Sequence, residues 1–175
     1  MSYPGFGRLQ ITSHLLPLML AGHFATALLA EQYAPAHRAS SALLGWYLVA
    51  SQLPDLLWIV FHYLRLEPPA PRAVFDTTLQ TMRVDMVYSH DLVPTLAWIV
   101  LLGVAGWGLF RSRRVGAMTA ALVTVHAGMD ALSGFPHHVF GTHTQEIGLG
   151  RYETAPYGAI GIEAGVTVAL VAWVF

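Results

Sequence analysis

The sequence predicts an all-α protein: a polytopic transmembrane helical bundle of about five spans, folded as a single domain over residues 1–175. Hydrophobic residues make up 55% of the chain and charged residues only 11%, and the mean hydropathy is +0.52. The apolar residues come in long blocks separated by short polar stretches, which is typical of integral membrane proteins. Neither a polar linker nor an internal repeat divides the chain, so we expect one domain.

Each of the five blocks is about long enough to cross a bilayer. They cover residues 12–30, 41–66, 86–110, 115–132 and 157–175. A cleaved signal peptide is the competing interpretation of the first block. Signal peptides carry positive charge ahead of the apolar segment, whereas residues 1–11 contain only one Arg, so we favour a retained helix. Pro54 is expected to kink the second span and free a backbone carbonyl about one turn earlier, inside the bundle. Residues 67–85 are expected to form an extramembrane loop, with a short amphipathic helix at 74–82.

The turn between the third and fourth spans gives the orientation. It holds Arg111, Arg113 and Arg114, and short basic loops stay on the cytoplasmic side. This places the N-terminus, the 67–85 loop and the 133–156 loop outside. Five spans then put the two termini on opposite sides.

Charge and cysteine content exclude some functions. The formal net charge is −1, whereas nucleic-acid binding requires a basic face, so we expect no nucleic-acid partner. The chain has no Cys, which excludes disulfides and thiolate metal sites. Any metal ligands must therefore be His, Asp or Glu.

Ionisable side chains of the predicted spans gather at one end of the bundle. With alternating topology, the first span begins on the face where the second ends, the third begins, the fourth ends and the fifth begins. At 1.5 Å per residue, most of the polar residues fall roughly 5–18 Å from that face. They are His14, His23, Asp55, His62, His90, Asp91, His126, Asp130 and Glu163.

His126 and Asp130 are the centre of this polar set. They are four residues apart, so both lie on one helical face. An Asp near mid-bilayer costs about 2.5–3.5 kcal/mol and needs a partner. Only Arg65 and Arg83 are plausible cationic partners, and both sit at or beyond helix ends. A divalent metal would supply the missing charge, and His with carboxylate suits Zn best, or Mn or Fe. Protonated acids in a proton relay are the alternative.

The predicted metal ligands are imidazoles and carboxylates at that end of the bundle. They are His23, Asp55, His90, His126 and Asp130. His137, His138 and Glu163 are expected either to complete this ligand set or to orient the imidazoles. Glu163 or Asp91 is predicted to be the general base of a catalytic site.

Simpler interpretations apply to several of these residues taken singly. His14 and His62 are equally well explained as interhelical hydrogen-bonding residues, and His37 as a loop residue. Asp91 is equally well explained as a helix N-terminal residue stabilised by the macrodipole. The remaining acids are expected to be solvated charges: Glu67, Asp76, Asp85 and Glu153.

Six short motifs follow one another along nearly the whole chain. They are Gly22-His23-Phe24-Ala25, residues 52–58 (QLPDLLW), Tyr88-Ser89-His90, His126 with Asp130, Gly148-Leu149-Gly150 and Glu163. Their order resembles a family of bacterial integral membrane proteins labelled metal-dependent hydrolases and, more distantly, the inner-membrane YdjM-like group. The resemblance implies that His23, Asp55, His90, His126, Asp130 and Glu163 are the functional positions, and that the protein lies in the bacterial inner membrane. Asp91 replaces a Ser of the family pattern, and the stretch at 135–138 lacks its Asp.

The leading hypothesis is a membrane-embedded, metal-dependent hydrolase of a lipid-linked or amphiphilic ester or phosphoester, with membrane lipid as its partner. The alternative is a non-catalytic accessory subunit of a larger membrane complex or homo-oligomer, with a structural polar or metal cluster. A b-type haem held by two His would leave the carboxylates unexplained. A nucleophilic Ser89 lacks any elbow or oxyanion motif.

Overall fold

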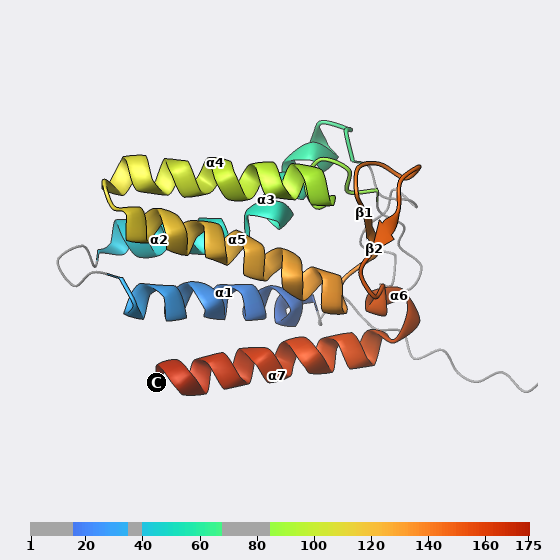
Figure 1. Cartoon of the computed structure of the whole chain (residues 1–175). Helices are drawn as coiled ribbons and strands as arrows, with labels where there is room; N and C mark the ends of the chain where they lie inside the picture. The colour runs from blue at the N-terminus through green and yellow to red at the C-terminus, as the bar shows by residue number, and fades with distance from the viewer. Residues whose placement is uncertain (1–15, 35–39, 68–84) are drawn as a thin grey trace, which may run out of the picture.

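The computed structural model describes residues 16–34, 40–67 and 85–175, with side chains described from Gly22 onward. These residues form helices and one antiparallel two-stranded hairpin (Figure 1). The helices are α1 (Leu16–Gln32), α2 (Ser41–Ser51), α3 (Leu53–Tyr63), α4 (Leu92–Phe110), α5 (Arg113–Ser133), α6 (Arg151–Thr154) and α7 (Pro156–Val174). The strands are β1 (His137–His138) and β2 (Glu146–Ile147). The all-α prediction is confirmed, and the small hairpin lies within the predicted 133–156 loop.

Three helices, α4, α5 and α7, are long and apolar enough to cross a membrane. The α2–α3 pair makes a fourth if it is one span bent by 65°. α1 has 17 residues in the described part of the chain, and residues 12–15 of the predicted first span lie outside it. The chain is therefore a helical membrane protein, and five spans stay a prediction. His14, His37, Asp76 and the predicted helix at 74–82 also lie outside the described residues.

The predicted kink at Pro54 is confirmed. α2 ends at Ser51 and α3 begins at Leu53, so Pro54 lies in the first turn of α3. A proline is tolerated there because the first turn of a helix lacks acceptors for its N–H groups anyway. The last carbonyls of α2 lose their intrahelical partners at the same point, and one of them, that of Ser51, is used by the functional site.

The predicted start of the third span at residue 86 is wrong, because α4 begins only at Leu92. Residues 86–91 form a turn in which the N–H groups of His90 and Asp91 both donate to the Met86 carbonyl, at 3.0 and 3.1 Å. Hydropathy alone extends the span through this stretch, whereas its backbone groups are bound outside any helix. His90 therefore sits on a turn ahead of α4.

α4 and α5 pack closely after a tight connection. Arg111 adopts a left-handed conformation (φ 47°) that ends α4, and the Ser112 side chain accepts from the Val115 N–H to cap α5. The contact requires glycine, because a Cβ added at Gly116 would lie 2.6 Å from the Gly103 carbonyl oxygen. The basic turn thus joins two antiparallel neighbours.

The buried core lies between α1, α2 and α5 and centres on Leu43, Tyr47 and Val115. α4 and α7 instead expose many large apolar side chains, as expected for helices that face lipid. The beginnings of α1, α4 and α7 and the end of α5 lie at one end of the bundle, together with the hairpin and α6 (Figure 1). This arrangement agrees with the predicted gathering of polar residues at one end.

Candidate metal centre

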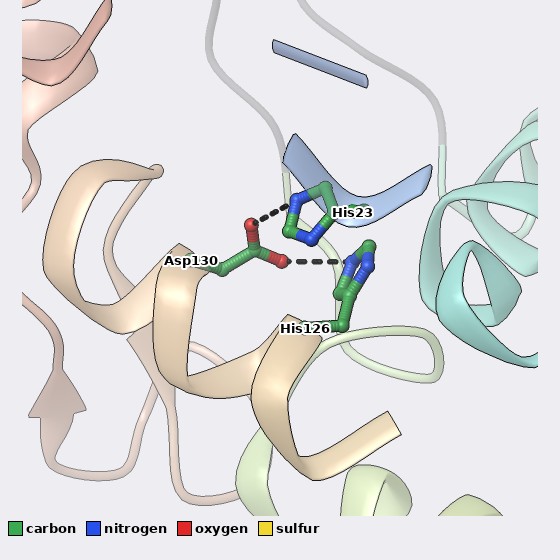
Figure 2. A group of neighbouring side chains, drawn as sticks. All are labelled: His23, His126 and Asp130. Atoms are coloured by element: carbon green, nitrogen blue, oxygen red, sulfur yellow. Dashed lines mark ion pairs between the residues drawn. The ribbon is translucent and has the colours of Figure 1, made fainter. Parts of the chain in front are cut away.

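His126 and Asp130, one turn apart on α5, form the middle of the site. His126 Nε2 lies 3.1 Å from Asp130 Oδ2, and the His126 side chain is fully buried. The spacing of four residues predicted this shared face. Both side chains point away from the α5 axis toward α1 (Figure 2).

α1 contributes His23 to the other oxygen of the same carboxylate. His23 Nε2 lies 3.6 Å from Asp130 Oδ1, and its ring stacks on that of His126 with centroids 3.9 Å apart. Asp130 therefore lies between two imidazoles from different helices (Figure 2).

α3 and the turn before α4 bring in Asp55 and His90. His90 Nε2 lies 3.5 Å from Asp55 Oδ1 and 3.5 Å from Asp130 Oδ2. His126 Nε2 lies 3.9 Å from the same Asp55 oxygen. The following set is called the His/Asp cluster: His23, Asp55, His90, His126 and Asp130.

The Ser51 carbonyl determines which ring nitrogen of His126 carries the hydrogen. Its Nδ1–H donates to the Ser51 carbonyl at 2.8 Å, and a carbonyl can only accept. A neutral His126 consequently presents the lone pair of Nε2 to the carboxylates of Asp55 and Asp130. The break between α2 and α3 thereby orients a ring on α5.

The same argument applies to His90. Its Nδ1 lies 2.8 Å from Ser89 Oγ, and the Ser89 hydroxyl donates its proton to Glu67 Oε2, also at 2.8 Å. Since that proton is used, Ser89 Oγ accepts from His90 Nδ1–H, and Nε2 is left as a lone pair. Donation of one ring N–H outward with the other nitrogen turned inward is the usual arrangement of metal-binding histidines.

Lone pairs that face carboxylate oxygens at 3–4 Å repel one another unless a proton or a cation lies between them. In the described part of the chain, neither His126 Nε2 nor Asp130 Oδ2 makes a hydrogen bond. The described residues include two groups in which three ligand atoms all lie within 4.8 Å of one another. One group is His23, His126 and Asp130, and the other is Asp55, His90 and His126. These buried His/Asp groups could hold a metal ion.

His137 and His138, the other two predicted ligands, lie on β1 and outside both groups. The His137 ring stacks on His90, with centroids 5.2 Å apart and planes 13° from parallel. Burial, and secondarily the nearby His90, lowers the pKa of His137 to about 4, so its ring is neutral at pH 7. His138 contributes its backbone N–H to Asp91.

Asp91 connects the hairpin to the start of α4. It occupies the N-cap position of α4, and its two oxygens accept from the backbone N–H groups of His138 (2.8 Å) and Gly141 (2.6 Å). The contacts of this buried carboxylate are therefore with the hairpin. Its position at a helix N-terminus agrees with the simpler interpretation of the sequence.

Glu163, on α7, is buried and belongs to neither group of ligand atoms. Its Oε1 accepts from Ser133 Oγ at 2.8 Å and from the Tyr152 hydroxyl, whereas its Oε2 has no hydrogen-bond partner among the described residues. Burial, and then the charge of Glu163, raises the pKa of Tyr152, so the phenol stays protonated and keeps donating. Hydrogen bonds therefore hold Oε1 of Glu163 in place, and Oε2 is available to a further partner.

Glu67 was predicted to be a solvated charge, and this is wrong: it is fully buried and hydrogen-bonded to Ser89. Hydropathy and motif spacing do not indicate it, because its burial depends on the turn at 86–91. Its place at the same end of the bundle as His90 is the one signal that the sequence contains. Asp85, in contrast, is exposed as predicted.

Fold and site together define a helical membrane protein with a buried His/Asp cluster able to hold a metal ion. Comparison with known proteins finds no match among family models, curated proteins or solved structures. The resemblance to metal-dependent membrane hydrolases stays a prediction.

Proposed function

We propose that this protein is a membrane-embedded zinc hydrolase that cleaves a lipid-linked or amphiphilic ester or phosphoester. The observation that carries the proposal is the orientation of His90 and His126. Each gives Nδ1–H to an acceptor outside the cluster and presents Nε2 toward Asp55 and Asp130. Fixed imidazole lone pairs beside buried carboxylates are the chemistry of a zinc site.

The cluster fits one ion. Both groups of ligand atoms include His126, and the single lone pair of its Nε2 binds only one metal. A tetrahedral zinc with bonds of about 2.0–2.1 Å needs ligand atoms about 3.3–3.4 Å apart. The separations between His90 or His126 Nε2 and the Asp oxygens, 3.1 to 3.9 Å, bracket that value.

The accessibility of the cluster favours catalysis over a purely structural role. The Asp55 side chain is 30% exposed, whereas that of His126 is 0% exposed. Structural zinc sites are closed, and catalytic sites keep a position open to water or substrate. We infer that substrate enters from the Asp55 side.

The bound ion would supply Lewis acidity to a phosphoryl or acyl oxygen and to the attacking water. Glu163 is the proposed general base, because its Oε2 has no hydrogen-bond partner among the described residues. Its backbone also packs beside His23: a Cβ added at the neighbouring Gly22 would lie 3.7 Å from the Glu163 carbonyl oxygen. It would take a proton from the attacking water and return it to the leaving oxygen. Tyr152 and Ser133 hold its other oxygen in place.

An amphiphilic substrate is supported by an open apolar groove of about 270 Å³. Its walls come from α3 and the turn after it, and from α4 and the turn before it, and include Phe61, Leu66, Tyr88 and Trp98. Tyr88 is two residues from His90. With the basic turn after α4 on the cytoplasmic side, the groove and the His/Asp cluster would face the outer half of a bacterial inner membrane.

Turnover tests the proposal. The full chain, purified in detergent without chelator, is assayed against fluorogenic phospholipids and esters as isolated, after chelation, and after zinc is restored. We expect activity that chelation removes, zinc restores and Asp130→Asn abolishes, with the exposed Asp85→Asn as the matched control. Bound zinc without turnover of any substrate would contradict the hydrolase and leave the accessory-subunit alternative.

A further inference from the structure

Glu67 owes its buried position to a strained turn. Arg65 has φ 60°, a left-handed conformation that non-glycine residues rarely adopt. This conformation lets the N–H groups of Leu66 and Glu67 both donate to the Phe61 carbonyl, at 2.9 and 3.3 Å. The chain after α3 is thereby turned so that Glu67 lies under the turn that carries His90.

The Glu67 carboxylate accepts hydrogen bonds from that turn. Oε1 accepts from the backbone N–H groups of Tyr88 (2.5 Å) and Ser89 (2.9 Å), and Oε2 accepts from Ser89 Oγ (2.8 Å). All three donors lie within two residues of His90. Charge-assisted bonds of this kind are stronger than neutral ones, so the direction of the Ser89 hydroxyl is firmly set.

We propose that Glu67 is a positioning residue for the metal centre, acting through Ser89 to hold His90 in the tautomer with hydrogen on Nδ1. Only then does the Nε2 lone pair face Asp55 and Asp130. The proposal rests on the metal centre proposed above, and it assigns a role to a residue outside the cluster. Partners of this kind typically change metal affinity by about 10–100-fold when they are removed.

Glu67→Gln is the sharpest variant, because it keeps the shape of the side chain and reverses the hydrogen-bond direction. Two backbone N–H groups face Oε1, so the amide oxygen of the Gln must lie there and its NH₂ must face Ser89. Ser89 would then accept from that NH₂ and donate to His90 Nδ1. The hydrogen of His90 would move to Nε2 and block the metal-binding lone pair.

The first readout needs no metal. Ring ¹⁵N shifts of the chelator-treated full chain, labelled with ¹⁵N-histidine, report which nitrogen of His90 is protonated, and His90→Gln assigns the signals. We expect Nδ1 of His90 to carry hydrogen in the wild type and in Asp85→Asn, and to be without hydrogen in Glu67→Gln. An unchanged His90 tautomer in Glu67→Gln would overturn the proposal.

The second readout is the affinity for Co²⁺, used as a spectroscopic probe for zinc. We expect Glu67→Gln and Ser89→Ala each to weaken binding by about 10–100-fold, and the double variant to be no weaker than the single ones. A reversed tautomer with unchanged affinity would overturn the role in metal binding.

The hydrogen-bond relay from Glu67 through Ser89 to His90 can also be tested if Glu67→Gln does not fold. Ser89→Ala then decides, because a wild-type tautomer and a wild-type affinity in that variant would refute the relay. A wild type that binds no Co²⁺ would refute the metal centre, while the ¹⁵N shifts still test the relay.

Discussion

His126 Nε2 lies 3.1 Å from Asp130 Oδ2, and no hydrogen joins the two atoms when the ring is neutral, because His126 gives its N–H to Ser51. The two groups come from one helix face, so the helix itself enforces their approach. A buried pair of this kind is unfavourable without a positive charge between the atoms. The metal-centre proposal follows from this relationship.

We expect metal affinity to fall as the pH is lowered. An imidazole binds a metal only through an unprotonated nitrogen, so protons compete with zinc for His23, His90 and His126, and the competition strengthens as the pH falls. Zinc competition titrations between pH 7.5 and 5.5 measure the effect. Equal affinity at the two ends of this range would contradict ligation by imidazole.

Glu163→Gln is expected to separate binding from chemistry. Glu163 belongs to neither group of ligand atoms, so the metal content should stay at the wild-type level. Loss of a general base lowers kcat by about 10²–10⁴-fold. Elemental analysis and turnover on the same preparation measure both. A variant that loses its metal would place Glu163 among the ligands instead.

Asp91→Ala is expected to loosen the hairpin. The N–H groups of His138 and Gly141 would lose their acceptor. Leaving buried donors unsatisfied costs about 1–3 kcal/mol. Hydrogen exchange of residues 137–147 should accelerate, while exchange within α7 should not change. Unaltered exchange in the hairpin would show that Asp91 does not anchor it.

Gly116→Ala is expected to disrupt the packing of α4 on α5. The added Cβ would approach the Gly103 carbonyl oxygen to 2.6 Å, and overpacking of this kind costs about 1–3 kcal/mol. Gly128→Ala is the control on the same helix, because nothing lies within 4 Å of its added Cβ. Thermal unfolding in detergent should show a lower Tm for the first variant and no decrease for the second. Equal Tm values would contradict the close contact.

The sequence predicts those features that depend on local pattern or on chain direction. The hydropathy blocks predict the ends of α5 and α7 to within about two residues, and Pro54 predicts the break between α2 and α3. Alternating helix direction places His23 and His90 at the same end as Asp130, and the structure brings them together.

The remaining features depend on hydrogen bonds between distant segments. The turn at 86–91 forms partly because Glu67 binds its N–H groups, a contact between residues about twenty positions apart. The turn begins with the apolar residues Met86, Val87 and Tyr88, so hydropathy extends the third span too far. Asp91 is likewise committed to backbone groups about fifty positions away. No pattern within one segment indicates such partners.

Metal content per chain tests the central claim most directly. Because both groups of ligand atoms share His126, we expect one zinc per chain in protein purified without chelator, and less than about a tenth of that in His126→Ala. His62→Ala, which changes a histidine outside the cluster, should keep the full amount. Metal-free wild-type protein that also fails to take up added zinc, or full zinc content in His126→Ala, would contradict the metal centre.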